Sequence, residues 1–153
     1  DLIPHDKITE FVNATETIGA IMIWPSNRIG QMTTINGERG FNRKISDRLD
    51  LTIECIKRYY LGIQSPLFEV FKRYANFFSL FEDFRGYIDF FLLQDAVSAD
   101  YSFVRISKPF DNFSSSPIPN SIGGYLEYVK NTTEFVKARN KRIERNYSIR
   151  KLD

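Results

Sequence analysis

Apolar side chains recur every three or four residues through the middle of the chain, and many of them are aromatic. This spacing places one apolar stripe along each of several successive helices, because an α-helix makes one turn in about 3.6 residues. The pattern predicts helices over residues 41–61, 66–81 and 84–97, with Phe41 as the first core position and Ser65 as the N-cap of the second helix. The predicted core residues of that second helix are Leu67, Val70, Phe71, Tyr74, Phe78 and Phe81. Since the chain contains 14 Phe, 8 Tyr and 1 Trp, these stripes predict a core built largely from aromatic rings.

Shorter patterns flank these three helices. Residues 121–145 repeat apolar positions at alternating steps of four and three behind Ser121 as N-cap, so they predict a long last helix. The apolar runs 17–25 and 101–107 are rich in β-branched residues and predict two strands that are able to pair. The segment that precedes the first helix, residues 26–40, predicts a loop with a tight turn at Asn36-Gly37.

We therefore predict a mainly α fold, in which about four helices pack as an aromatic-rich bundle with a small two-stranded β element. An α+β fold is the alternative. The length of 153 residues fits one domain over residues 1–153. The chain begins with Asp1 instead of Met, so we expect it to be the C-terminal part of a somewhat longer protein.

The overall charge and the cysteine content exclude several classes of protein. A net charge of +2 creates no general attraction for nucleic acid. The single cysteine, Cys55, excludes an internal disulfide and a cysteine-based zinc cluster, and its helical context predicts a buried thiol. Because the sequence shows neither a signal peptide nor a membrane-spanning run, we expect a cytoplasmic protein without a membrane partner.

The first candidate site lies in residues 34–50, which read TINGERGFNRKISDRLD. Two glycines and an arginine stand directly before the predicted helix 41–61, where free N–H groups and the helix dipole favour an anion. Arg39 and Arg43 are one helical turn apart and are suited to hold a phosphate or a carboxylate together. We therefore predict that a nucleotide, an RNA phosphate or another anionic small molecule binds to Asn36, Gly37, Arg39, Gly40, Asn42 and Arg43.

Four carboxylates support an alternative function. Asp47, Asp50 and Glu54 fall on one face of the predicted helix 41–61, where their repulsion is relieved either by arginines or by a divalent cation. Asp89 lies in the nearly all-apolar pattern 84–97, so we expect it to be buried and paired, with Arg85 as one partner, or to act as a general acid or base. A carboxylate- and metal-dependent hydrolase or nuclease is therefore the alternative, beside a plain solvated face of ion pairs.

Other catalytic and cofactor motifs do not occur in the sequence. The only histidine is His5, and no serine stands in a Gly-x-Ser-x-Gly turn. Neither the Lys-Ser/Thr pair of a P-loop nor the glycine-rich dinucleotide fingerprint is present. We therefore identify no cofactor and assign no metal ligands.

The last predicted helix leaves a third function open. Its basic end, residues 137–151, suits RNA phosphates, but cations at that position also complement the helix dipole. Its apolar stripe is able to pack either on the core or on a second copy of the chain. The third hypothesis is therefore a structural or protein-interaction module that forms a homo-oligomer through this helix.

Six segments of the sequence carry a resemblance to a known family. In chain order they read IGAIMIWP, TINGERGFNRKISDRLDLTIECIKRYYLG, SPL, LFEDFRGYIDFFLLQD, PFDNF and EFVKARNKRI. Together they resemble an uncharacterised family of bacterial proteins over nearly the whole chain. The resemblance implies a bacterial cytoplasmic origin and an additional N-terminal segment, and it implies no catalytic residue.

Overall fold

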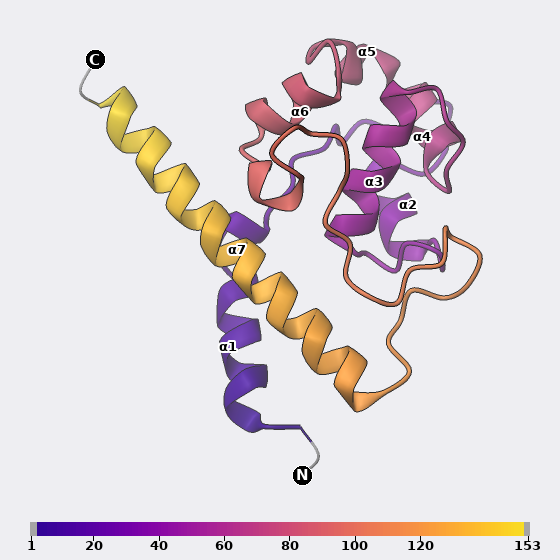
Figure 1. Ribbon diagram of the computed structural model, residues 1–153. Coiled ribbons are helices and arrows are strands. Elements are labelled where there is room, and N and C mark those ends of the chain that lie inside the picture. Colours follow the sequence, from indigo (N-terminus) through magenta and orange to yellow (C-terminus); the bar gives the residue numbers. More distant parts are fainter. Residues whose placement is uncertain (1–2, 152–153) are drawn as a thin grey trace.

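The computed structural model describes residues 3–151, and within that range the protein is mainly helical (Figure 1). The described elements are, in order, α1 (His5–Thr15), η1 (Ile18–Ala20), α2 (Ile35–Phe41), α3 (Leu49–Tyr60), α4 (Phe68–Arg73), α5 (Ala75–Ser79), α6 (Phe84–Phe90), η2 (Gln94–Ala96) and α7 (Ile122–Arg150), where η denotes a 3-10 helix. The predicted mainly α class is confirmed, but the middle of the chain forms more and shorter helices than expected. In the described range, no helix is both long and apolar enough to cross a membrane.

The middle of the chain, residues 35–113, forms a unit that we call the aromatic globule. Its buried core extends from Ile35 in α2 to Phe113 in the loop before α7. Phe78 lies near the centre of the ring cluster, with its ring centroid 4.8 Å from that of Phe71 and 4.9 Å from that of Tyr59. The predicted aromatic core is therefore present.

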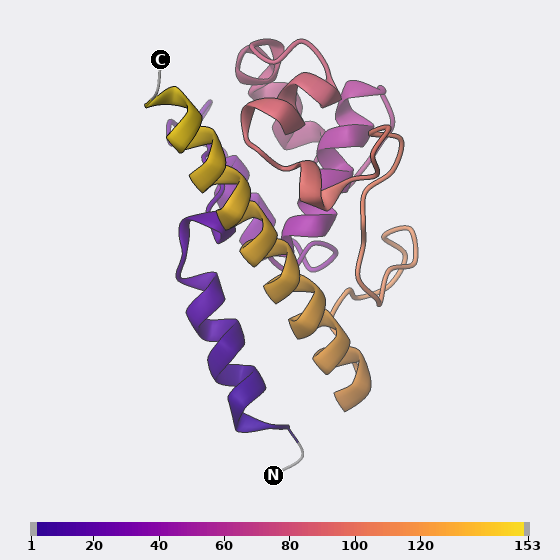
Figure 2. The ribbon, with the colours of Figure 1, turned by 60° about the vertical axis from the view of Figure 1, so that its left-hand side comes forward.

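Helices α1 and α7 form a second unit, which we call the helical arm. Figures 1 and 2 show α7 as one long helix along the side of the aromatic globule, with α1 against it. Ser121 caps α7 as predicted, since its hydroxyl accepts a hydrogen bond from the N–H of Gly124 at 3.1 Å. The α7 stripe buries Val129, Thr133 and Val136 inside the chain's own fold. The helix continues to Arg150, beyond the predicted end at residue 145.

The predicted two-stranded β element is wrong. Within residues 3–151 the only β pairing is an isolated bridge between Val97 and Val104, and the two predicted strands do not pair with each other. Side chains of α7 bind the backbone of the first run: Asn140 Oδ1 accepts from the N–H of Gly19 at 2.7 Å, and Arg139 donates to the carbonyls of Gly19 and Ile21. These backbone groups need no partner strand, because side chains already satisfy them.

The predicted helix 41–61 is also wrong at its N-terminal end. It is divided between α2 and α3 by a turn at residues 42–48, in which Ser46 and Asp47 have φ angles of 49° and 58°. Phe41, which the stripe placed in the core, is 84% exposed. Asn36-Gly37 lies in the first turn of α2 instead of forming a hairpin turn, because Thr34 caps that helix through the N–H of Gly37.

The other two predicted helices are interrupted as well. The pattern 66–81 forms α4 and α5, which meet at Tyr74, and Leu67 replaces the predicted Ser65 as the cap position. All of its predicted core residues are buried: Leu67, Val70, Phe71, Tyr74, Phe78 and Phe81. The pattern 84–97 forms α6 and η2, because Leu92 between them adopts a left-handed backbone with φ of 54°.

Candidate functional site

Arg39, the centre of the predicted anion site, is held inside the protein and is only 6% exposed. Its Nε donates to Thr52 Oγ1 at 2.9 Å, its Nη1 donates to Asn36 Oδ1 at 3.2 Å, and its Nη2 lies 3.3 Å from Asp47 Oδ1. The guanidinium also lies over the ring of Trp24, 5.5 Å from the ring centroid. Burial lowers the pKa of Arg39. These contacts give Arg39 a structural role, which joins α2 to α3.

Arg43 has the opposite environment from Arg39. It follows the end of α2, is exposed, and its side chain forms no ion pair with another residue of the range 3–151. Arg39 and Arg43 therefore do not offer two neighbouring guanidinium groups to one anion in solvent. The start of α2 is also occupied, because Thr34 accepts the N–H groups of Gly37 and Glu38, and Gly40 lies exposed in the last turn of that helix.

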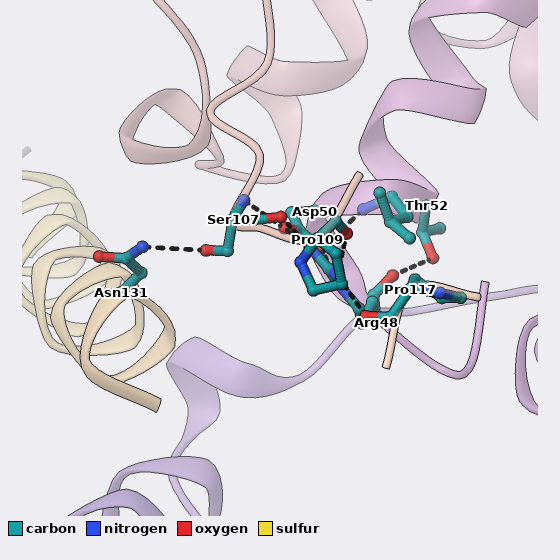
Figure 3. Close-up of polar contacts among 8 residues, drawn as sticks. Arg48, Asp50, Thr52, Ser107, Pro109, Pro117 and Asn131 are labelled. Carbon is teal, nitrogen blue, oxygen red and sulfur yellow. Dashed lines mark hydrogen bonds and ion pairs between the residues drawn. The ribbon is translucent and has the colours of Figure 1, made fainter. Parts of the chain in front are cut away.

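Asp50, a predicted catalytic or metal-binding residue, is fully engaged by protein groups (Figure 3). Arg48, whose side chain is 4% exposed, binds it through Nε at 3.1 Å and Nη2 at 2.7 Å. The N–H groups of Leu51 and Ser107 each donate to Asp50 at 2.9 Å. Arg48 also donates to the carbonyls of Ser107, Pro109 and Pro117. Asp50 thus fixes the start of α3 to the loop that precedes α7.

The other predicted acids lie in separate surroundings. Glu54 is buried and binds Arg58 at 3.0 Å and Lys57 at 3.5 Å, whereas the Asp47 side chain is 71% exposed and contacts Arg39. Asp89 was expected to be buried, but its side chain is 45% exposed because α6 turns it outward; Arg85, the predicted partner, lies 3.8 Å away. Within the described part of the chain, no three His, Cys, Asp or Glu residues are grouped as a metal site.

The Cys55 thiol and several cations at the basic end of α7 also have structural roles. Cys55 is fully buried, and burial raises its pKa to about 12, so the thiol stays protonated at neutral pH. Arg142 binds Asp95 at 2.9 Å, and Arg139 is buried among backbone carbonyls. Several cations of the predicted RNA-binding end therefore have partners within the chain.

The residues that remain available around the turn 42–48 line an open hollow, which we call the basic hollow. Its lining comes from the turn itself, the end of α3, the segment before α4 and the loop before α7, and consists of Asn42, Arg43, Lys44, Arg58, Gln64, Ser65, Pro66, Asn112, Phe113 and Ser114. Three of these ten side chains are cationic, and none of the ten is acidic. Of the six residues of the predicted anion site, the hollow includes Asn42 and Arg43. Its lining does not include Asn36, Gly37, Arg39 or Gly40.

Three residues of the basic hollow were missed in the sequence. None of Lys44, Arg58 and Asn112 was assigned to a site, although Arg58 lies four residues after Glu54, a spacing that suits an ion pair on a helix. The ion pair is present, but Arg58 Nη2 also donates to Asn112 Oδ1 at 2.6 Å. No local pattern signals this contact, because 54 positions separate the two residues. The adjacent pair Arg43-Lys44 was the only signal available.

Comparison with known proteins places the chain in one family. It belongs to a family of unknown function, DUF6994, whose model matches residues 1–143. The resemblance to an uncharacterised family is therefore confirmed over nearly the whole chain. No curated protein and no solved structure matches the chain.

Proposed function

We propose that the protein is a binding domain for a small phosphate-bearing molecule, which it holds in the basic hollow. The observation that carries the proposal is the composition of the lining, with three cations and no carboxylate among the ten residues. The whole chain has nearly balanced charges, with 21 Lys and Arg against 19 Asp and Glu. A local surplus of cations in one concave surface favours an anion there.

Two kinds of cation meet in the basic hollow. Arg58 is fixed, because Glu54 and Asn112 hold its guanidinium and Phe113 lies beneath it with the ring centroid 4.9 Å away. Arg43 and Lys44 are exposed and form no ion pair in the range that the structure describes. A fixed guanidinium orients a phosphate, and two longer cationic side chains are free to close on it.

Asn42 rigidifies the turn that carries Arg43 and Lys44. Its Oδ1 accepts the N–H of Lys44 at 3.0 Å, and its Nδ2 contacts Glu38 Oε1 at 3.3 Å and the carbonyl of Pro66 at 3.5 Å. Asn42 therefore has a structural role that supports the binding role of its neighbours. A preformed turn loses little conformational freedom when a ligand binds.

The test is a calorimetric titration of pyrophosphate into the full chain at low ionic strength. We expect the double variant Arg43→Gln/Lys44→Gln to bind about tenfold more weakly or worse, because two charge-assisted contacts are lost. Added salt should weaken wild-type binding, since both side chains are exposed. The melting temperature should change little, because neither side chain contributes a described ion pair.

The matched control is Arg28→Gln, which removes one exposed cation that lies outside the hollow. It should leave pyrophosphate binding unchanged. Equal affinity of the wild type and the double variant would show that the hollow does not bind phosphate.

A further inference from the structure

A second cavity lies between the aromatic globule and the helical arm, with a volume of about 440 Å³. We call it the α3–α7 cleft. Its lining comes from the start of α3, from segments 95–96 and 105–107, and from the middle of α7: Leu49, Asp50, Ile53, Asp95, Ala96, Arg105, Ile106, Ser107, Tyr128, Asn131, Thr132, Glu134, Phe135 and Ala138. The volume falls within the range of small-molecule sites, roughly 300–1,000 Å³.

The charges of this cleft leave one group without a counter-ion. Each of its three carboxylates has a cation nearby: Asp50 has Arg48 at 2.7 Å and Asp95 has Arg142 at 2.9 Å. The third, Glu134, lies 3.9 Å from Lys130. The only cation in the lining is Arg105, which forms no ion pair with any residue from 3 to 151.

Arg105 is an exposed residue whose backbone and Nε are held by neighbouring carbonyls. Its Nε donates to the carbonyl of Val97 at 3.2 Å, and its backbone N–H donates to the carbonyl of Ala96 at 2.8 Å. No hydrogen bond within the described chain uses either of its Nη groups. A guanidinium that is anchored through Nε keeps two parallel donors, which match the two oxygens of a carboxylate.

The remaining walls suit the body of an organic molecule. Leu49, Ile106 and Phe135 are partly exposed and supply apolar surface, whereas Asn131 and Thr132 supply hydrogen-bonding groups on α7. Burial raises the pKa of Tyr128, so its phenol stays protonated and is able to donate. A mainly apolar pocket with a few directed polar groups is the usual form of a small-molecule site.

We propose that the α3–α7 cleft binds a small organic acid, with its carboxylate on Arg105 and its apolar body against Leu49, Ile106 and Phe135. This site is independent of the basic hollow, since the two linings share no residue. The ligand class follows from Arg105 alone, because its Nη groups form no hydrogen bond within the described chain and suit one carboxylate at that end of the cleft.

A hydrogen-bonded chain keeps the cleft in shape without ligand (Figure 3). Arg48 binds Asp50, Asp50 accepts from the N–H of Ser107, and Ser107 Oγ accepts from Asn131 Nδ2 at 3.2 Å. These contacts join α3, the 105–107 segment and α7, all of which contribute residues to the lining. Ligand binding therefore requires little rearrangement of the cleft, so the cost of ordering the site does not weaken the affinity.

The test compares benzoate, 4-hydroxybenzoate and phenylacetate with their neutral amides by NMR titration of the full chain. We expect the acids to bind more tightly than the amides and to shift the amide signals of Ser107, Asn131 and Phe135. Arg105→Gln should weaken the acids roughly ten- to hundredfold, to the affinity of the amides, because the guanidinium–carboxylate pair is lost. Ala138→Leu should block acids and amides alike by filling the cleft.

Two variants serve as controls. Lys141→Gln removes an exposed cation of α7 outside the cleft and should leave the affinities unchanged. The double variant of the basic hollow, Arg43→Gln/Lys44→Gln, should also bind the acids normally, whereas Arg105→Gln should bind pyrophosphate normally. Acids that bind no better than their amides in wild type, a panel without any binding, or affinities unchanged by Arg105→Gln would each overturn the proposal.

Discussion

The aromatic globule and the helical arm are stabilised by different interactions. In the globule, rings pack against one another: Phe78 is 1% exposed and has ring centroids of Phe71, Tyr59 and Phe77 within 5.2 Å of its own. The arm is joined to its surroundings largely through directed polar contacts. Arg139 of α7, for example, donates to three backbone carbonyls, those of Gly19, Ile21 and Phe91, at 2.7–3.0 Å.

The two kinds of interaction predict which part of the molecule opens first. Ring packing is shared among many contacts, so no single contact decides the stability of the globule. Arg139 instead carries a buried charge without a described carboxylate partner, and burial lowers its pKa. Since the arm depends on these directed contacts beside its few buried apolar residues, such as Val129 and Val136, we expect it to separate from the globule at a lower free energy than global unfolding.

The largest expected effect is the loss of a central ring. Phe78→Ala should lower the free energy of unfolding by about 3–5 kcal/mol, because it removes buried area and leaves a cavity. Urea denaturation followed by circular dichroism measures the change. The control is Leu80→Ala, at a side chain that is 74% exposed, which should stay within about 0.5 kcal/mol of wild type. Similar losses for both variants would contradict a core centred on Phe78.

The next effect tests the arm. Arg139→Met should cost about 2–3 kcal/mol, because three carbonyls lose their donor when the arm is docked. Hydrogen exchange should speed up in residues 17–24 and α7 more than in α3, which distinguishes undocking from global unfolding. Lys141→Met, at an exposed position two residues away, is the matched control. Uniform acceleration in both units would mean that arm and globule unfold together.

A steric change at the same junction should have a smaller effect. A Cβ atom at Gly19 would lie 2.5 Å from the carbonyl oxygen of Val136 and 2.6 Å from Asn140 Oδ1, so Gly19→Ala should cost about 1–3 kcal/mol. Gly40→Ala is the control, because a Cβ there meets nothing within 4 Å and alanine favours the helix. Thermal unfolding of both variants should show a loss for the first and no loss for the second.

The buried face of each segment was more predictable than the ends of its helices, for a physical reason. Apolar periodicity reports which side of a segment is buried, and it correctly identified the six core positions from Leu67 to Phe81. It does not report where a helix breaks, because the turn at residues 42–48 depends on left-handed residues and on the Asp47 N–H, which donates to the Arg39 carbonyl. The missing β element has a similar cause, since side chains of α7 satisfy the backbone that a strand would use.

The candidate sites were less predictable than the fold. Arg39 and Arg43 look alike in sequence, and only the tertiary contacts with Thr52 and Asp47 make the first structural. Asp50 and Glu54 were grouped because they share a helix face, but each is paired with a different arginine. The α3–α7 cleft had no sequence signal, because its lining comes from segments that are brought together only by the packing of α7.

The smallest expected effect distinguishes the contribution of ring packing from that of hydrogen bonding within the aromatic globule. Tyr87 is fully buried, but its hydroxyl has no described hydrogen-bond partner, whereas the Tyr60 hydroxyl donates to the carbonyl of Phe78 at 2.7 Å. Tyr87→Phe should therefore leave the free energy of unfolding within about 0.5 kcal/mol of wild type, or raise it, because an unpaired polar atom is removed from the core. Tyr60→Phe should cost about 1 kcal/mol, the usual value of one hydrogen bond. If Tyr87→Phe proves the more damaging change, the hydroxyl of Tyr87 has a partner in solution, and the globule depends on polar contacts as the arm does.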